Sequence, residues 1–379
     1  MTANSLHLQK ATLQVPDDFE LLELMLEDME SAPVLYKPTN YWSIFINNYV
    51  PELRQNGLID YRRSRDTAIG RFVKPDSIPP SAKIILSQNR WLHNRYTIKI
   101  PGWVRLLETI SEYLTDKLFI QLGYAISPEN LWELSFAYVK QMASQTNAYP
   151  LEKIQPSLYG NPEAIFEQNG TIYPFSFLTY YARYVYCARF INFKAVRRVV
   201  ELGSGGGQQA EVLKKCHPDL TILLFDIPPQ SYVCEQYLKA SFPDQVRSYR
   251  NNREISSLDE LEEGKIHILG AAQMPLLNNY RHDLFISCVS LAEMEPHIVR
   301  NYLGIVNNSA RNVYLSQYFY GKATARKKGL PGVLKPSVFK DYEDSLDQLT
   351  LIDRSPINSN LGIARGEKVT EDAFWKRPV

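Results

Sequence analysis

One short segment, Glu-Leu-Gly-Ser-Gly-Gly-Gly at 201–207, constrains the fold of this chain more than any other feature. It follows a short apolar run and precedes residues that can begin a helix, and Asp226 ends the next apolar run, nineteen positions after Gly207. Glycine keeps side chains out of a strand-to-helix turn, so a ligand can reach the backbone and the helix N-terminus. The segment therefore predicts a parallel α/β unit with a nucleotide-type cofactor site.

The residues around this turn predict the elements of that unit. Residues 197–202 are a candidate first strand, 208–216 a helix and 220–225 a second strand, because apolar residues dominate both strand segments. An acid that ends the second strand, here Asp226, can accept hydrogen bonds from both hydroxyls of an adenosine ribose.

The spacing of the glycines separates two kinds of cofactor fold. A dinucleotide fold has the fingerprint G-x-G-x-x-G, which requires glycine at the position where this chain has Gln208. Instead, Gly203, Gly205 and Gly207 alternate after Glu201, and this arrangement resembles motif I of class I S-adenosylmethionine-dependent methyltransferases. An NAD or FAD fold and a glycine turn without a ligand remain as alternatives.

Composition argues against several functions. The net charge of the 379 residues is +1, which gives no basic surface of the kind that binds nucleic acid or an anionic membrane. The four cysteines have no metal-type spacing, the first residues lack the apolar core of a signal peptide, and no apolar run approaches the ~20 residues of a membrane span. We expect a cytoplasmic protein with a small-molecule acceptor and no nucleic-acid or membrane partner, and homo-oligomerisation stays open.

Helical patterns dominate the first part of the chain and predict a mainly helical N-terminal domain, 1–155, that covers the acceptor pocket or mediates oligomerisation. The helices expected there are 41–53, 103–122 and one that starts at Ser127-Pro128-Glu129 and ends near Ala143. Proline and glycine accumulate between 149 and 174, which marks the boundary with a cofactor-binding domain, 156–379.

The second domain alternates strand and helix patterns. An aromatic-rich helix at 175–193 leads into the first strand. The elements expected after the second strand are helix 230–241, strand 265–269, strand 283–289, helix 296–307 and strand 312–317. Such alternation predicts a doubly wound, Rossmann-like α/β sheet, in which ligands bind at the carboxyl ends of the strands. The segments expected to meet at that edge are the glycine turn, Asp226, 271–274, 290–293 and 318–320.

Three more segments follow motif I in order: DIPP at 226–229, YLKASFP at 237–243 and SLAEMEP at 290–296. With them, and with the tyrosine-rich helix before the first strand, the chain resembles the sugar O-methyltransferase family, and the Tyr41-Trp42 pair extends this resemblance faintly. The resemblance implies a class I methyltransferase fold, S-adenosylmethionine as methyl donor and a hydroxyl of a sugar or glycosylated small molecule as acceptor. Hydroxyls or amines of other natural products, an NAD-dependent oxidoreductase and a non-catalytic cofactor-binding protein remain as alternatives.

This resemblance also implies roles for individual residues. Glu201 would reach the amino group of the cofactor, and the glycines would line its methionine and ribose. Ile227 would pack on the adenine face, with ordinary core packing as the alternative, and Gln273 would bond the adenine edge. The expected cofactor-binding residues are Glu201, Gly203, Gly205, Gly207, Asp226, Ile227, Gln273 and Ser290.

Methyl transfer is an in-line displacement that depends on alignment, and a sugar hydroxyl needs a base to take its proton. Glu293 is the first candidate base, with a helix-capping acid as the alternative, and His297 is the second, with a surface residue as the alternative. The Glu-x-Glu-x-His order at 293–297 is too weak a signal for a metal site, so no metal is expected.

Aromatic side chains of the helix before the first strand are expected to form walls for the acceptor, because tyrosine can stack on a pyranose face and bond its hydroxyls. The residues are Tyr173, Tyr180, Tyr181 and Tyr184, with core packing as the alternative. The basic loop at 321–329 has glycine at both ends; we expect it to be solvated, with a lid over the acceptor as the alternative.

Overall fold

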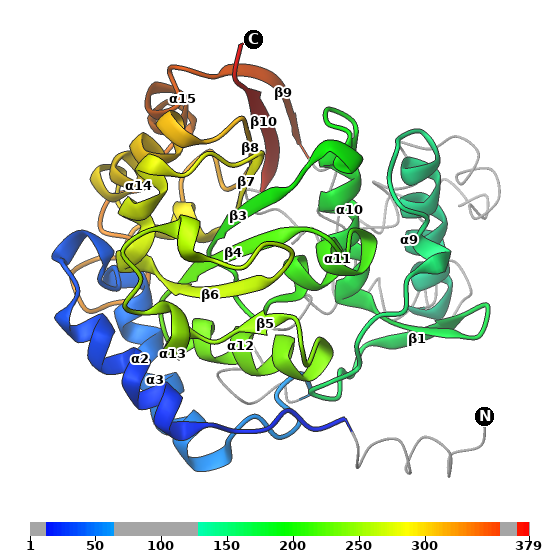
Figure 1. The fold of residues 1–379 in the computed structure, drawn as a ribbon, viewed down its shortest axis with the longest axis horizontal. Coiled ribbons are helices and arrows are strands. Elements are labelled where there is room, and N and C mark those ends of the chain that lie inside the picture. Colours follow the sequence, from blue (N-terminus) through cyan, green and yellow to red (C-terminus); the bar gives the residue numbers. More distant parts are fainter. Residues whose placement is uncertain (1–12, 64–127, 357–369, 379) are drawn as a thin grey trace, which may run out of the picture.

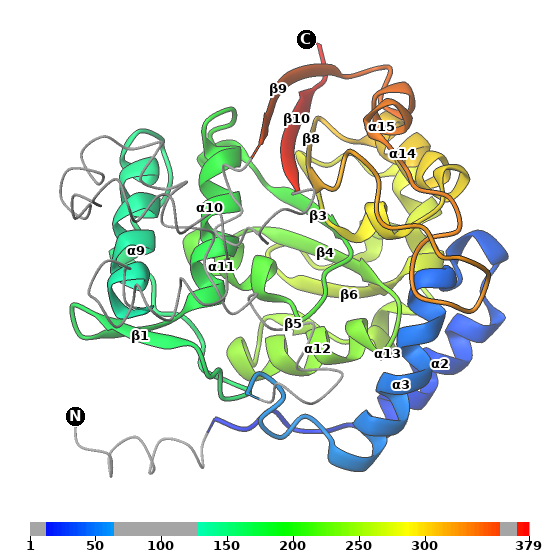
Figure 2. The same ribbon diagram turned by 180° about the vertical axis from the view of Figure 1, so that it is seen from behind.

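The computed structural model describes residues 13–63, 128–356 and 370–378. An eight-stranded sheet runs through the middle of the molecule with helices on both of its faces (Figures 1 and 2). The helix expected at 103–122 lies outside the described residues. Within them, no helix is both long and apolar enough to cross a membrane.

Five parallel strands form the centre of the sheet, and all five are predicted by the sequence. They are β3 (Arg198–Leu202), β4 (Thr221–Asp226), β6 (Ile266–Gly270), β7 (Leu284–Cys288) and β8 (Asn312–Gln317). The strand order reverses at β3, because this strand pairs with β4 on one side and with β7 on the other. Ligands bind at such a switch point in doubly wound sheets. The predicted Rossmann-like α/β fold is confirmed.

Three further strands extend the sheet beyond the predicted ones. β5 (Val246–Arg247) pairs in parallel with β6 at one edge. At the other edge, β10 (Glu371–Lys376) runs antiparallel to β8, and β9 (Thr350–Pro356) runs antiparallel to β10. The antiparallel pair covers the edge of β8, so that β8 is buried along its whole length.

A separate hairpin leads into the helix that precedes the sheet. Its strands are β1 (Ile165–Gln168) and β2 (Thr171–Pro174), and α10 (Phe175–Ala188) follows directly. The helix expected at 175–193 is therefore shorter than predicted. Its last expected residue, Phe193, begins a separate 3-10 turn, Phe193–Ala195, whose first turn is capped by the Asn192 side chain.

Alternation along the strands divides the apolar residues between two cores. Val199 of β3 belongs to the core on the face that carries α10, α11 (Gln208–Cys216) and α12 (Gln230–Ser241). Val200 belongs to the core on the other face, under α14 (Pro296–Ser309) and α15 (Phe339–Ser345). Successive side chains of a strand point to opposite faces, and burial on both faces explains why the central strands are mostly apolar.

The described helices from residues 1–155 lie at opposite ends of the molecule (Figures 1 and 2). α2 (Phe19–Ser31) packs on α12 and on the short α13 (Tyr249–Asn252), and α3 (Asn40–Asn56) runs beside α2. α9 (Pro128–Ser144) packs on α10. Both α2 and α9 contribute apolar residues to the core on the α10 face of the sheet.

Candidate functional site

The glycine turn joins β3 to α11 at the switch point of the sheet. A side chain at Gly205 would meet nothing within 4 Å, so this position faces open space. Gly203 allows Ser290 to approach, because a Cβ at Gly203 would lie 1.7 Å from the Ser290 Oγ. Gly207 allows α11 to pack on α12, since its Cβ would lie 2.9 Å from the Leu238 Cγ. The side of the turn that is open to a ligand is therefore at Gly205, whereas Gly207 serves helix packing.

Glu201, near the end of β3, is a buried acid with an unused acceptor. The residue is 3% exposed, and its Oε2 atom has no hydrogen-bond partner in the described structure. Burial raises the pKa of this carboxyl to about 8, although the nearby Arg183 lowers it. Because a buried carboxylate oxygen without a partner is unfavourable, a cationic group of a ligand would stabilise it.

Asp226 ends β4 and holds the glycine turn in place. Its Oδ2 accepts a hydrogen bond from the Gly205 N–H at 2.8 Å, and its Oδ1 accepts one from the Ile227 N–H at 2.8 Å. Burial raises the pKa of Asp226 to about 7, and the negative charge of Glu293 contributes. The Ser204 hydroxyl also donates to Oδ2, at 3.4 Å, so the lone pair left for a ribose hydroxyl is on Oδ1.

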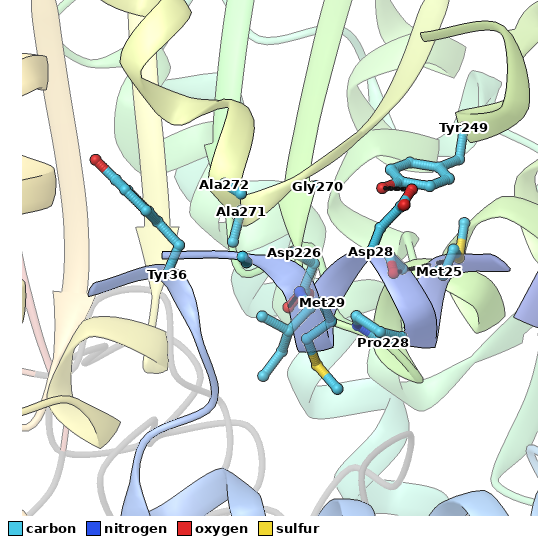
Figure 3. A pocket seen from close by; sticks show the side chains of 13 residues that line it. Met25, Asp28, Met29, Tyr36, Asp226, Pro228, Tyr249, Gly270, Ala271 and Ala272 are labelled. Carbon is cyan, nitrogen blue, oxygen red and sulfur yellow. Dashed lines mark hydrogen bonds between the residues drawn. The ribbon is translucent and has the colours of Figure 1, made fainter. Parts of the chain in front are cut away.

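A shallow pocket, partly open to solvent, lies beside Asp226 between the sheet edge and α2 (Figure 3). Its lining residues are Asp226, Ile227, Pro228, Ser231, Tyr249, Gly270, Ala271 and Ala272 from the sheet domain, and Met25, Asp28, Met29, Ala32 and Tyr36 from the N-terminal segment. The small residues after β6 and the flexible side chains of Met25 and Met29 form an apolar slot. Such apolar walls, which include Ile227, suit contact with a flat ring such as adenine.

Gln273 is absent from the residues that line this pocket. Its Oε1 accepts a hydrogen bond from the Gly270 N–H at 2.9 Å, and its Nε2 donates to the Asn252 carbonyl at 2.7 Å. The side chain thereby joins the end of β6 to α13. The expected bond to the adenine edge is corrected to a structural bond, because both ends of the amide are already engaged by the backbone.

Glu293 lies at the same edge, in the 3-10 turn Ser290–Glu293 that follows β7. The residue is 6% exposed; its Oε2 accepts a hydrogen bond from the Trp42 Nε1 at 2.8 Å, and its Oε1 forms an ion pair with Lys322. Burial raises the pKa of Glu293, and the positive charge of Lys322 opposes that rise. Since the charge of Glu293 also raises the pKa of Asp226, the two acids share one electrostatic environment.

The backbone just before Glu293 is strained. Val289 has φ +69° and ψ −35°, a region that a β-branched residue rarely adopts. Its N–H donates to the Ser316 carbonyl at 2.7 Å, and its own carbonyl accepts from the Ala292 N–H at 3.0 Å. These two bonds hold the turn that carries Ser290 against Gly203. Strain of this kind gathers at functional sites.

The partners of Glu293 come from distant parts of the chain. Besides Trp42 of α3, the Thr39 hydroxyl donates to the Glu293 carbonyl at 2.9 Å. The Lys322 Nζ lies 4.1 Å from the centre of the Tyr41 ring. The Tyr41-Trp42 pair is the sequence signal that could have located this cluster. Lys322 differs from the expected solvated loop, since its side chain is only 19% exposed.

His297, the second candidate base, is on the first turn of α14 and is exposed. Glu295 accepts a hydrogen bond from the Leu334 N–H at 3.1 Å and so holds the segment after the basic loop. In the described parts of the chain, no group of three His, Cys, Asp or Glu side chains could hold a metal ion. The exposed position of His297 matches the alternative of a surface residue rather than a base.

Three of the four expected acceptor tyrosines are core residues. Tyr173, Tyr181 and Tyr184 are at most 1% exposed. The hydroxyls of Tyr173 and Tyr181 donate to the carbonyls of Leu151 and Tyr149, at 3.2 and 2.6 Å, and the Tyr184 hydroxyl accepts from the Tyr149 N–H at 2.7 Å. They are corrected to packing residues because their hydroxyls bond the backbone. Tyr180 is half-buried and lies close enough to Glu201 for the two groups to interact electrostatically.

No protein-family model and no curated protein matches this sequence. Solved methyltransferase structures resemble part of it. The mitomycin 7-O-methyltransferase MmcR is 13% identical with a TM-score of 0.36, over 54% of each chain. The O-methyltransferase NcsB1 from neocarzinostatin biosynthesis, in complex with S-adenosyl-L-homocysteine and 1,4-dihydroxy-2-naphthoic acid, is 14% identical with a TM-score of 0.35, over 54% of this chain and 57% of its own.

A third structure is an S-adenosylmethionine-dependent methyltransferase from Clostridium acetobutylicum, 14% identical with a TM-score of 0.30, over 49% of this chain and 85% of its own. The chain matches about half the length of MmcR and of NcsB1. Similarity at this level says nothing about the activity or substrate of this protein.

Proposed function

We propose that this protein is an S-adenosylmethionine-dependent methyltransferase. Three features support the cofactor: the turn that is open at Gly205, the unsatisfied oxygen of Glu201 and the apolar slot that ends at Asp226. In this proposal the slot holds adenine, Asp226 binds a ribose hydroxyl and Glu201 binds the amino group. When bound, the cofactor supplies an electrophilic methyl group on a sulfonium.

The acceptor in this proposal is a hydroxyl of a sugar or of a glycosylated small molecule, and Glu293 is the base. The observation that carries this assignment is a buried carboxylate with a raised pKa at the edge that binds the cofactor. A raised pKa makes a carboxylate a better proton acceptor. Lys322 opposes the rise, which favours the ionised form, and the Trp42 N–H fixes the orientation of the carboxylate.

Aromatic rings of α3 support an acceptor with a flat or pyranose face. The Trp42 ring lies 6.1 Å from the Tyr41 ring and 5.9 Å from the Phe45 ring, between ring centres, and all three residues are only partly buried. Such rings stack on sugar faces, in agreement with the family resemblance. They suit an aromatic ring equally well, so a phenolic hydroxyl or an amine of a non-sugar natural product is the second candidate.

The cofactor and the acceptor are tested separately. Calorimetric titration with S-adenosylhomocysteine should give binding in the micromolar range, roughly −8 kcal/mol. Tight NADH binding without a response to S-adenosylhomocysteine would place the protein among oxidoreductases instead. Mass spectrometry of products from a panel of glycosides, free sugars and phenols then locates the methyl group. A methyl on nitrogen or carbon contradicts O-methylation, and binding without turnover across the panel favours a non-catalytic protein.

A further inference from the structure

Arg183 is a half-buried cation of α10 that the proposed site does not yet use. Its Nε is buried and has no hydrogen-bond partner, and the described residues supply no ion pair to its guanidinium. The Arg183 Cζ lies 5.2 Å from the centre of the Tyr180 ring, one turn earlier in the helix. A cation whose buried Nε has no partner is unfavourable, so an anionic partner from outside the described chain would stabilise it.

The surroundings of Arg183 locate it at the carboxyl ends of β3 and β7. Its positive charge lowers the pKa of Glu201, the second-last residue of β3, and the pKa of Cys288, the last residue of β7. Tyr180 also interacts electrostatically with both Arg183 and Glu201. A cation and an anion, each with an unsatisfied buried atom, therefore lie near one another, beside the glycine turn.

Asp372 of β10 provides a structural alternative, because it too interacts electrostatically with Arg183. Its Oδ1 accepts a hydrogen bond from the Tyr314 hydroxyl at 2.8 Å. No ion pair joins Arg183 to Asp372 in the described structure, so this carboxylate leaves the guanidinium Nε without a direct partner. The two roles of Arg183 can be distinguished by ligands that differ in one group.

We propose that Arg183 and Glu201 bind the amino-acid end of the cofactor, Arg183 its α-carboxylate and Glu201 its α-ammonium group. This inference rests on the cofactor of the proposed function. A zwitterion satisfies both unpaired groups, and a planar guanidinium can donate two parallel hydrogen bonds to a carboxylate. The strand order agrees with this assignment of the two ends of the cofactor. The proposed adenine slot lies at the ends of β6 and β4, next to Asp226. Glu201 and the nearby Arg183 lie beside the ends of the neighbouring strands β3 and β7.

Three ligands test the assignment by calorimetry. S-adenosylhomocysteine carries both groups, its decarboxylated analogue keeps only the amine, and 5′-methylthioadenosine has neither. Arg183→Met should bind S-adenosylhomocysteine about 10- to 100-fold more weakly and bind the other two as the wild type does. Glu201→Gln should weaken the first two ligands and leave methylthioadenosine unchanged. The wild type itself should prefer S-adenosylhomocysteine over its decarboxylated analogue by about 10-fold or more.

Arg189→Met is the matched control, because Arg189 caps the same helix and its side chain is 40% exposed. It should bind all three ligands as the wild type does. Equal losses for all three ligands in Arg183→Met, or no preference of the wild type for the carboxylate, would overturn the inference in favour of a structural arginine. If wild-type protein binds none of the three, the proposed cofactor itself fails, and this inference with it.

Discussion

The two halves of the candidate site are built in different ways. The glycine turn and Asp226 of the cofactor half come from one stretch of chain, in which the Gly205 N–H and the Asp226 carboxylate that bind each other are 21 residues apart. The acceptor half joins Glu293 to Trp42, 251 residues earlier, and to Lys322 in the loop after β8. Local geometry can position the glycine turn and Asp226, whereas the surroundings of Glu293 depend on the packing of α3 against the sheet domain. Substitutions in the two halves should therefore affect different quantities.

The largest effect is expected in the acceptor half. Glu293→Gln keeps the shape of the side chain but removes the base, so kcat should fall by about 10²-fold or more with nearly unchanged affinity for S-adenosylhomocysteine. Steady-state kinetics and calorimetry measure the two quantities. His297→Asn, an exposed position nearby, is the control and should behave as the wild type. Wild-type turnover in Glu293→Gln would show that Glu293 is not the base.

The next effect is expected in the cofactor half. Asp226→Asn retains one carbonyl oxygen but loses the charge and an acceptor, so affinity for S-adenosylhomocysteine should fall about 10- to 100-fold. The exposed Asp219→Asn is the matched control. Unchanged affinity in Asp226→Asn would show that this residue does not bind the ribose. It would also contradict the assignment of Asp226 to the cofactor half.

Trp42→Phe tests whether α3 belongs to the acceptor half. The substitution keeps an aromatic ring and removes the N–H that donates to Glu293. We expect kcat to fall about 3- to 10-fold, because the carboxylate loses one orienting hydrogen bond. Affinity for S-adenosylhomocysteine should stay constant. An equal fall in cofactor affinity would mean that the two halves are coupled rather than independent.

The smallest effect on the maximal rate is expected for Lys322→Met, which should change mainly the pH dependence. The base must be ionised, so activity is lost as the pH falls through the pKa of Glu293. Lys322 lowers this pKa against the effect of burial; without it the pKa rises further. The acid limb of the kcat profile should therefore move to higher pH, whereas Lys327→Met, in the exposed part of the loop, should leave it in place. A limb that moves to lower pH contradicts the role of Glu293 as base.

The cofactor half could be predicted from sequence because each of its signals is local. Helices 208–216 and 230–241 begin and end as predicted, and each central strand is displaced by one residue at most, since turn glycines and apolar runs report directly on backbone geometry. Gln273 was misassigned for a nonlocal reason: its amide bonds the Asn252 carbonyl, which lies 21 residues earlier. The prediction for Tyr181 and Tyr184 was wrong for another reason: tyrosines that stack on a ligand and tyrosines that pack in a core have the same sequence pattern.

The edge strands were missed because their pattern is misleading. β10 starts with Glu371 and Asp372, which are 4% and 2% exposed, so a strand that begins with two acids is in fact buried. Arg354 of β9 stabilises the first of them with a hydrogen bond of 2.6 Å from its Nε. Such acids can be buried here because a neighbouring strand, distant in sequence, supplies their hydrogen-bond partner, and a single sequence does not show which strands pair.

The position of α2 has a consequence for the lifetime of bound ligand. Met25 and Met29 line the apolar slot beside Asp226, and ion pairs of Asp18 with Arg250 and of Asp28 with Arg253 fasten α2 to the α13 region. α2 forms one wall of this slot, so these ion pairs hold that wall against a bound ligand. Because salt screens partly exposed ion pairs, spent cofactor should dissociate faster as ionic strength rises, even where its equilibrium contacts with the sheet are unchanged.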